Sequence, residues 1–487
     1  MELSNKRLII LTILIAFLLV ISSYPKDLID VTDLYDYSDA ARIFAGDYKA
    51  KERSSHSMLY GFLLSPLVKI TGNFFIIKFM SLLWLFLLII LIYHISGKNR
   101  KSLLLLLVSP LIWYMAPWLS PLPLVYLLFT LAYFFIDKFK IYGKYKYFIY
   151  SGLCLGLASA LWDPALYFSI IFLFSFFYNK KLYSSLWFAS LIIAGMVPKF
   201  ILDYVFFDFA FYGLIKHLLS TISFSLFKGI YEEYTSTIAA TILTLIFIPI
   251  YFFFLYKKEV FIKYKSPVIF ITLSWLFVIL TNAQPRLIFI PLPIALLILG
   301  RILGNKQVKI QIVVSLAISF FVITPYLIQI THEINLPFVS EYFIDFRNIK
   351  ISSEITSDNL RNDLINLGEE YPLETFVVGN APDDYRKLAH FYWGDNIKEF
   401  VSIQDYNLYY NNQSIISSKR FETSPPPNVR RTIWLEAGLG KNQNDKTDYD
   451  SISYALSLEG NLTLKNFQFV KKYKSLYLYK KLSQEHI

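Results

Sequence analysis

Acidic side chains are concentrated in one short stretch near the start of the chain. Between residues 27 and 52 there are seven acids, which are Asp27, Asp30, Asp33, Asp36, Asp39, Asp47 and Glu52. Lys51, Arg53 and His56 lie at the end of this stretch. A carboxylate beside an apolar surface can act as a general base toward a hydroxyl group when its neighbours tune its pKa. Most of these acids could equally belong to an ordinary solvated loop.

The spacing of the acids would bring part of the stretch onto one helical face. Asp33, Tyr37 and Ala41 are four residues apart, and Arg42 follows directly. Because residues four apart lie above one another on an α-helix, we expect these three to face the same side. Asp36 or Asp39 could supply a second carboxylate. The acids Asp33, Asp36 and Asp39 could hold a divalent cation, although a spacing of three does not resemble a compact metal loop, and no other cofactor is indicated.

Two further candidates lie at turns between apolar segments. Arg286, close to Gln284, has a planar guanidinium that can pair two phosphate oxygens, but it could also be an interfacial arginine whose head reaches water. Asp163 lies in Trp162-Asp163-Pro164, which is typical of a helix N-cap followed by proline at the first helical position. Contact with a substrate is the alternative role for Asp163.

The composition predicts that these residues are positioned by membrane-spanning helices. Of 487 residues, 55% are apolar and only 17% are charged, whereas soluble domains are roughly 45–50% apolar. A water-soluble enzyme is therefore excluded. The sequence has no phosphate-binding glycine loop, no H-E-x-x-H motif and no clustered Cys/His set, so nucleotide-driven transport and zinc hydrolysis lack their usual residues. The single cysteine, Cys154, can form no intrachain disulfide.

Loop charges predict how the apolar segments are oriented. About eleven segments are expected, at 8–23, 74–95, 103–118, 121–136, 148–162, 164–178, 183–204, 235–256, 266–283, 286–300 and 310–329. If they alternate sides, the six loops on the N-terminal side carry 18 Lys/Arg and three acids. Because positive loops stay in the cytoplasm, the N-terminus is predicted to be cytoplasmic, and the acidic stretch and the C-terminal region are predicted to be outside.

The chain divides into two parts that differ in charge and in pattern. Residues 1–329 carry 29 Lys/Arg and 15 Asp/Glu, whereas residues 330–487 carry 18 and 21, so the basic excess belongs to the membrane part and no nucleic-acid partner is indicated. Short β-like runs at 375–378, 432–435 and 475–479 alternate with polar helical stretches at 354–368 and 383–393. We therefore predict a multi-pass α-helical membrane domain, 1–329, and an extracytoplasmic α/β or α+β domain, 330–487.

The first outer stretch resembles that of a known superfamily. The pattern Asp33-x3-Tyr37-x3-Ala41-Arg42, then Gly46-Asp47-Tyr48 and His56…Tyr60-Gly61…Pro66, is similar to the first outer loop of the GT-C glycosyltransferases. These multi-pass enzymes use sugars linked to polyprenyl phosphates, and they include the protein O-mannosyltransferases and the aminoarabinose transferases of lipid A. The segment Pro285-Arg286-Leu287…Pro291-Leu292-Pro293 resembles the family's Arg-Tyr…Pro segment, with Leu287 in place of the aromatic residue.

The resemblance implies an activity and roles for the candidate residues. It implies an inverting hexosyl- or pentosyltransferase of the cell membrane that moves a sugar from a polyprenyl- or dolichyl-phosphate donor to a protein, glycolipid or polysaccharide acceptor on the outer face. Asp33 would be the catalytic base. The family often has two adjacent acids, but Leu34 follows Asp33, so Asp36 is the alternative. Expected substrate-binding residues are Tyr37, Asp39, Arg42, Lys51, Arg53, His56, Asp163, Gln284 and Arg286.

Three other functions fit parts of the sequence. A transporter or flippase of lipid-linked sugars would place ionisable residues near the bilayer midplane and would often show symmetric halves or interrupted helices. A polymerase or ligase of lipid-linked polysaccharide would favour a large outer loop late in the chain. A noncatalytic scaffold with an outer binding domain is the third. Charges that gather at the outer boundary favour the glycosyltransferase.

Overall fold

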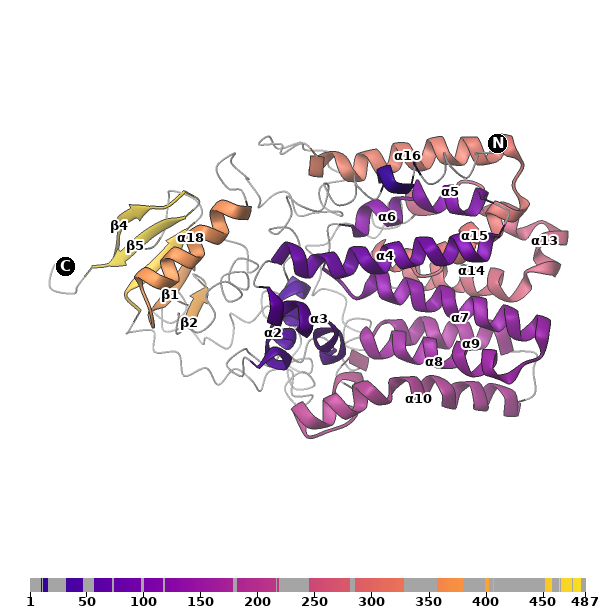
Figure 1. Ribbon diagram of the computed structural model, residues 1–487, viewed down its shortest axis with the longest axis horizontal. Coiled ribbons are helices and arrows are strands. Elements are labelled where there is room, and N and C mark those ends of the chain that lie inside the picture. Colours follow the sequence, from indigo (N-terminus) through magenta and orange to yellow (C-terminus); the bar gives the residue numbers. More distant parts are fainter. Residues whose placement is uncertain are drawn as a thin grey trace.

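The computed structural model describes most of the helical part and a smaller share of the C-terminal part (Figure 1). The described residues are 10, 12–15, 32–46, 57–71, 74–97, 100–116, 119–177, 182–215, 217–218, 245–280, 285–327, 357–379, 399–402, 406, 452–457, 464, 466–474 and 476–482. The boundary predicted at 329/330 lies outside them.

Helices make up most of the described chain up to residue 327. The first are α2 (Thr32–Ala45), α3 (Met58–Ile70), α4 (Phe74–Ser96), α5 (Lys101–Leu107) and α6 (Pro110–Met115). They are followed by α7 (Leu122–Tyr142), α8 (Tyr145–Leu161), α9 (Ala165–Phe177) and α10 (Leu182–Phe207). The last are η2 (Phe252–Tyr256), α13 (Lys258–Lys263), α14 (Lys265–Leu280), η3 (Pro285–Phe289), α15 (Leu292–Ile302) and α16 (Asn305–Leu327).

The long helices run side by side, and the basic turns gather at one end of the bundle. The α7–α8 turn, α13 and the α15–α16 connection lie at this end in Figure 1, whereas α2 and α3 lie at the opposite end. The α7–α8 turn is formed at Gly143, whose φ of +67° favours glycine. This arrangement agrees with the alternation predicted from the loop charges. Which end faces the cytoplasm stays a prediction.

Three of the described helices are long and apolar enough to cross a membrane: Phe79–Ser96 within α4, α7 and α10. The predicted number of about eleven spans stays a prediction. The segment predicted at 103–118 differs from expectation, because its described part forms two helices, α5 and α6, rather than one. The segment predicted at 286–300 is likewise divided, into η3 and α15. Ser109 caps α6 by accepting a hydrogen bond from the Leu111 amide, and Pro110 begins the new helix because it has no N–H to continue the old one.

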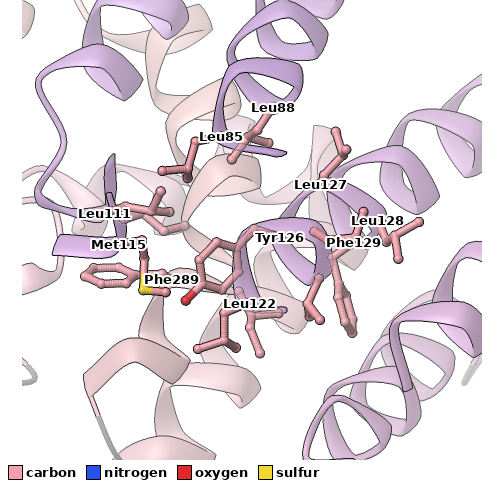
Figure 2. Close-up of a cluster of buried hydrophobic side chains, with 14 of the residues drawn as sticks. Leu85, Leu88, Leu111, Met115, Leu122, Tyr126, Leu127, Leu128, Phe129 and Phe289 are labelled. Carbon is pink, nitrogen blue, oxygen red and sulfur yellow. The ribbon is translucent and has the colours of Figure 1, made fainter. Parts of the chain in front are cut away.

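The bundle is held by a continuous apolar core. Figure 2 shows one part of it, where side chains of α4, α6 and α7 meet Phe289 of η3. Tyr126 of α7 and Phe289 are edge to face, with ring centroids 6.4 Å apart. Such aromatic contacts add roughly 0.5–1.5 kcal/mol to the burial of apolar area. The core therefore fixes η3, and with it the backbone at Arg286, against the helices.

The described part of the C-terminal region is a small mixed sheet with one helix. The strands are β1 (Thr375–Gly379), β2 (Glu399–Ser402), β3 (Tyr454–Ser457), β4 (Phe467–Lys472) and β5 (Tyr477–Lys481), in the order β2-β1-β3-β5-β4. Strand β1 is parallel to β2 and β3, whereas β5 is antiparallel to β3 and β4. The helix α18 (Ser357–Glu370) matches the polar helix predicted at 354–368. The strand predicted at 432–435 and the helix at 383–393 lie outside the described residues.

Candidate functional site

The acidic stretch forms a helix that packs closely on α3. Tyr37 and Ala41 of α2 are 1% and 0% exposed, and the rings of Tyr37 and Tyr60 meet edge to face at 5.2 Å. A Cβ at Gly61 would overlap Ala40, so glycine is required for this close approach of α2 to α3. The helix ends at Gly46, where φ is +105°. The inward face predicted from the spacing of Tyr37 and Ala41 is confirmed.

Polar contacts fix the start of α3 against the rest of the bundle. The Ser57 hydroxyl donates to the carbonyl of Ala160 in the last turn of α8, at 2.5 Å, and accepts from the Leu59 amide as the N-cap of α3. The Tyr60 hydroxyl lies 3.3 Å from Ser81 Oγ, which in turn bonds to the backbone of Ser120. These bonds hold the α2–α3 pair to α8, α4 and the turn before α7.

The other face of α2 packs on the last turns of α10. Ala40 and Ile43 form a small buried cluster with Met58 of α3, and Phe206 and Phe207 of α10 pack against it. The α2–α3 pair thus lies over the ends of α8 and α10, the same end of the bundle at which the α8–α9 turn is formed. The candidate residues of α2 and Asp163 of the α8–α9 turn are thereby brought to one end of the bundle.

A buried cluster of three charges lies at this end. Lys199 of α10 is 1% exposed, and its Nζ lies 3.2 Å from Asp163 Oδ1 and 3.5 Å from Asp203 Oδ2. The Gly213 amide donates to Asp203 Oδ2 at 3.0 Å, and a Cβ at Gly213 would collide with Lys199 Nζ. Burying charges is expensive unless they are paired. Each of these groups has an ion-pair partner, and Asp203 also accepts the Gly213 hydrogen bond, whereas Asp163 Oδ1 has no hydrogen-bond partner among the described residues. The cluster locks the α8–α9 turn to α10.

Asp163 therefore does more than start a helix. It lies in the turn before α9, but the helix begins at Ala165 and not at Pro164 as the Trp162-Asp163-Pro164 pattern predicts; the Asp163 carbonyl accepts from the Leu166 amide. Its carboxylate, however, is an ion-pair partner of Lys199. With all three side chains ionised, the cluster carries one net negative charge, which suits contact with a cationic or hydrogen-bond-donating group.

The other candidate arginine lies on a well-anchored element. In η3, the Ile288 carbonyl accepts from the Trp275 indole at 3.1 Å, and Phe289 packs on Tyr126. Arg286 belongs to η3, but its side chain lies outside the described residues. Gln284 lies outside them too. The structure thus places the backbone of Arg286 and leaves its role as a prediction.

The structure describes the remaining candidates to different extents. The backbones of Asp33, Asp36 and Asp39 lie on α2, but their side chains are outside the described part. Arg42 is described and is 8% exposed. Lys51, Arg53 and His56 are outside the described residues altogether. Within the described residues no group of three or more His, Cys, Asp or Glu could hold a metal, which leaves the divalent cation suggested for α2 untested.

Lys199 and Asp203 were not among the predicted site residues. The available signal was an opposite charge pair four residues apart within an apolar run, a spacing that favours pairing on one helical face. Sequence alone left open whether these residues pair or reach the interface. It gave no indication that Asp163, which lies before the preceding helix α9, completes the cluster.

No family model matches the chain, and no curated protein shows significant sequence similarity to it. Its fold, however, is similar to that of two crystal structures of ArnT from Cupriavidus metallidurans. The apo structure is 12% identical, with a TM-score of 0.59 over 98% of both chains. The structure bound to undecaprenyl phosphate is 10% identical, with a TM-score of 0.61 over 99% of both chains. The chain therefore shares, over nearly its whole length, the fold of ArnT, an aminoarabinose transferase of the GT-C type.

Proposed function

We propose that this protein is an integral-membrane glycosyltransferase that uses a polyprenyl-phosphate-linked sugar. The observation that carries the proposal is the ArnT-like fold over almost the entire chain, because one of the ArnT structures holds undecaprenyl phosphate. Fold alone does not define an activity, since one fold can serve several functions. The residues at the α2–α3 end of the bundle therefore supply the chemical part of the argument.

Asp33 is proposed as the catalytic base. It lies one turn before Tyr37 on α2, a helix that is fixed on α3 and α10 by buried contacts. A rigid support matters because a general base must lie within hydrogen-bond reach of the hydroxyl proton that it removes. The deprotonated acceptor oxygen would then attack the sugar carbon, the bond to the donor phosphate would break, and the configuration would invert. Asp36 is the alternative base.

The departing lipid phosphate needs positive charge, and Arg286 is proposed to supply it. Its planar fork can pair two phosphate oxygens, and η3 is held by the bond from Trp275 and by Phe289. Lys51, Arg53 and His56 are further candidates from the connection after α2. Asp163 is proposed to line the same end of the bundle, where Lys199 fixes its carboxylate.

The reaction is proposed to occur on the outer face of the membrane. The basic turns gather at the end of the bundle opposite to α2 and α3, and basic loops are retained in the cytoplasm. The acceptor would be a protein, a glycolipid or a polysaccharide. On this proposal the N-terminus is cytoplasmic and the C-terminal domain is extracytoplasmic.

The proposal is tested by direct assay of the full chain. Purified protein in nanodiscs is incubated with undecaprenyl-phosphate sugars and candidate acceptors, and the products are analysed by mass spectrometry. We expect an acceptor whose mass rises by one sugar unit, together with released undecaprenyl phosphate. If no donor–acceptor pair gives transfer while the protein is folded and binds undecaprenyl phosphate, the transferase proposal is wrong.

A transporter of lipid-linked sugars is the second candidate, and the α5–α6 break favours it. Interrupted helices are common in transporters, where they open backbone groups to a substrate. Here, however, the freed carbonyls are already occupied: Leu107 O accepts from the Trp113 indole and Val108 O accepts from Ser319 Oγ. Liposomes that contain the protein and a fluorescent lipid-linked sugar distinguish the two functions, because only a transporter would make the inner-leaflet probe accessible to an external quencher.

A further inference from the structure

The C-terminal hairpin carries an unusual concentration of positive charge. Between Glu459 and Glu485 the chain has six lysines and no acid, whereas the rest of 330–487 has 12 Lys/Arg and 21 Asp/Glu. Five of these lysines lie on or beside β4 and β5, namely Lys471, Lys472, Lys474, Lys480 and Lys481. We call β4, β5 and their connection, residues 467–481, the basic hairpin. Its charge is opposite in sign to that of the remaining domain.

The basic hairpin also exposes an aromatic surface at the edge of the sheet. Among the strands that the structure describes, β4 is at one edge, paired only with β5. Phe469 and Val470 on β4 are 52% and 47% exposed. The ring of Phe469 is backed by Tyr477 and Tyr479, with centroids 6.3 Å and 5.8 Å away. An exposed aromatic side chain held by two others offers a stable apolar face between cations.

Some lysines of the hairpin are held in place by aromatic rings. Lys472 Nζ lies 5.2 Å from the centre of the Tyr477 ring, and Lys481 Nζ lies 5.8 Å from that of Tyr406. Contacts of this kind restrain a flexible side chain before a ligand arrives, which lowers the entropy lost on binding. Lys471 differs, because it pairs with Glu370 at 3.0 Å. The strand register places Lys472 and Lys481 on the face of the sheet that carries Phe469, whereas Lys471 and Lys480 lie on the opposite face. Lys474 lies in the connection between the two strands and is exposed.

We propose that the basic hairpin binds a glycan that carries repeated phosphate groups. Several lysines along one strand pair suit a linear polyanion, because each contact releases counterions, and Phe469 suits the apolar face of a sugar ring. A lipid headgroup does not fit, since β4 and β5 lie at the end of the molecule farthest from the helical bundle (Figure 1). If this glycan is the sugar acceptor, that role rests on the proposed transferase function, but the binding itself does not.

The test is a binding measurement on the full chain in neutral detergent, with fluorescent dextran phosphate as the probe. Neutral dextran of the same length, inorganic polyphosphate and vesicles of anionic phospholipid are measured beside it. The first variant is Lys472→Gln/Lys474→Gln/Lys481→Gln, which changes the lysines of the Phe469 face and of the strand connection and spares the Glu370 pair. Its matched control is Lys140→Gln/Lys144→Gln/Lys146→Gln, three exposed lysines at the opposite end of the molecule. The second variant is Phe469→Ala, and thermal unfolding verifies that each variant is folded.

We expect dextran phosphate to bind and neutral dextran not to bind. The hairpin triple variant should bind at least about tenfold more weakly, and its binding should depend less on salt, because fewer exposed charge pairs are left to screen. Phe469→Ala should weaken binding of dextran phosphate and leave that of polyphosphate unchanged. The proposal is overturned if the control triple has the same effect, or if only the anionic vesicles bind through the hairpin. Asp33→Asn should bind dextran phosphate as tightly as wild type, because Asp33 lies on α2 and not on the basic hairpin. If dextran phosphate binds but no sugar transfer is found, the transferase proposal fails and the binding proposal stands.

Discussion

Lys199 shows how one residue can hold two distant parts of the chain. Its ammonium joins the α8–α9 turn, through Asp163, to its own helix, through Asp203. Removing one partner of a buried ion pair is strongly destabilising, because it leaves a charge without compensation. The stability lost on replacing Lys199 should therefore be far larger than the stability lost on replacing an exposed lysine.

The first prediction concerns this cluster. Lys199→Met leaves two buried carboxylates close together and should destabilise the protein by about 3–5 kcal/mol, read as a lower midpoint of thermal unfolding. Lys199→Met/Asp203→Asn should recover part of the loss, because one of the two carboxylates becomes neutral. Lys69→Met, an exposed lysine on α3, is the matched control and should change little. An unfolding midpoint equal to wild type in Lys199→Met would show that the cluster is not a stabilising clamp.

The second prediction concerns the catalytic base. Asp33→Asn keeps the shape of the side chain but removes its basicity, so the variant should fold and bind donor while turnover falls about 10²–10⁴-fold. Asp30→Asn, outside the helical motif, should leave turnover close to wild type. If Asp36→Asn or Asp39→Asn abolishes turnover while Asp33→Asn does not, the base has been assigned to the wrong acid. Activity in all three variants would remove the support for transfer chemistry at α2.

Part of the site could be predicted from single residues, and part could not. The four-residue spacing of Tyr37 and Ala41 was enough to predict that both lie on the buried face of a helix, because helical periodicity is a local property. The orientation of Asp33 on this helix stays a prediction. The pairing of Asp163 with Lys199 depends on how α8, α9 and α10 pack, and no local pattern encodes that. The side chains of the proposed base and of Arg286 stay predictions.

At the scale of elements, α8 and α10 cross closely because both have glycine at the crossing. A Cβ at Gly156 would overlap the Ile192 carbonyl, and Gly195 lies directly opposite. This contact holds α10 in the position at which Lys199 reaches Asp163. The crossing therefore supports the charged cluster as well as the packing of the helices.

The third prediction follows from this crossing. Gly156→Ala should separate α8 from α10 and lower the midpoint of thermal unfolding, by an amount typical of overpacking, about 1–3 kcal/mol. Gly304→Ala is the control, since a Cβ there would meet only the end of the Gln307 side chain at ordinary contact distance. Equal unfolding midpoints for the two variants would contradict the close approach.

The fourth prediction concerns the contact of α18 with the sheet. Glu370 accepts from the Tyr473 hydroxyl at 2.7 Å and from Lys471, and these hydrogen bonds lower the pKa of its carboxyl below the usual value. A lowered pKa in the folded state means that the ionised group adds stability above its unfolded pKa, and that this stability is lost as pH falls through the folded pKa. Wild type should therefore lose more thermal stability than Glu370→Gln between pH 7 and pH about 3.

The neighbouring residue provides the control for this pH effect. Glu369 is also exposed at the end of α18, so Glu369→Gln should keep the pH dependence of wild type. If Glu370→Gln and wild type lose stability in parallel on acidification, the Glu370 contacts do not contribute to holding α18 on the sheet.

Elements were predictable where a long apolar run determines them. The helices α4, α7 and α10 follow directly from such runs. The basic turns predicted which connections lie together at one end of the bundle. The helix α3 was not counted among the apolar segments, because its 13 residues are too few to stand out beside the acidic stretch. The α5–α6 break was also missed, although Ser109-Pro110 carries the signal for a capped restart.

The fifth prediction applies to the whole molecule. A Cys154→Ser background is labelled in intact cells with a membrane-impermeant thiol reagent after single cysteines are introduced. Sites at Asp47 and Asn412 should react, and a site at Lys144 should not, because the basic turns are predicted to be cytoplasmic. Permeabilised cells provide the control, since all three sites should then react. If only the cysteine introduced at Lys144 reacts in intact cells, the predicted topology is wrong and the opposite orientation holds.

The charge pair within α10 has a consequence for how the chain is made. A lone lysine deep in an apolar helix resists transfer from the translocon into lipid. Because Asp203 lies one turn after Lys199, α10 carries its own counterion and can enter the bilayer before its tertiary contacts exist.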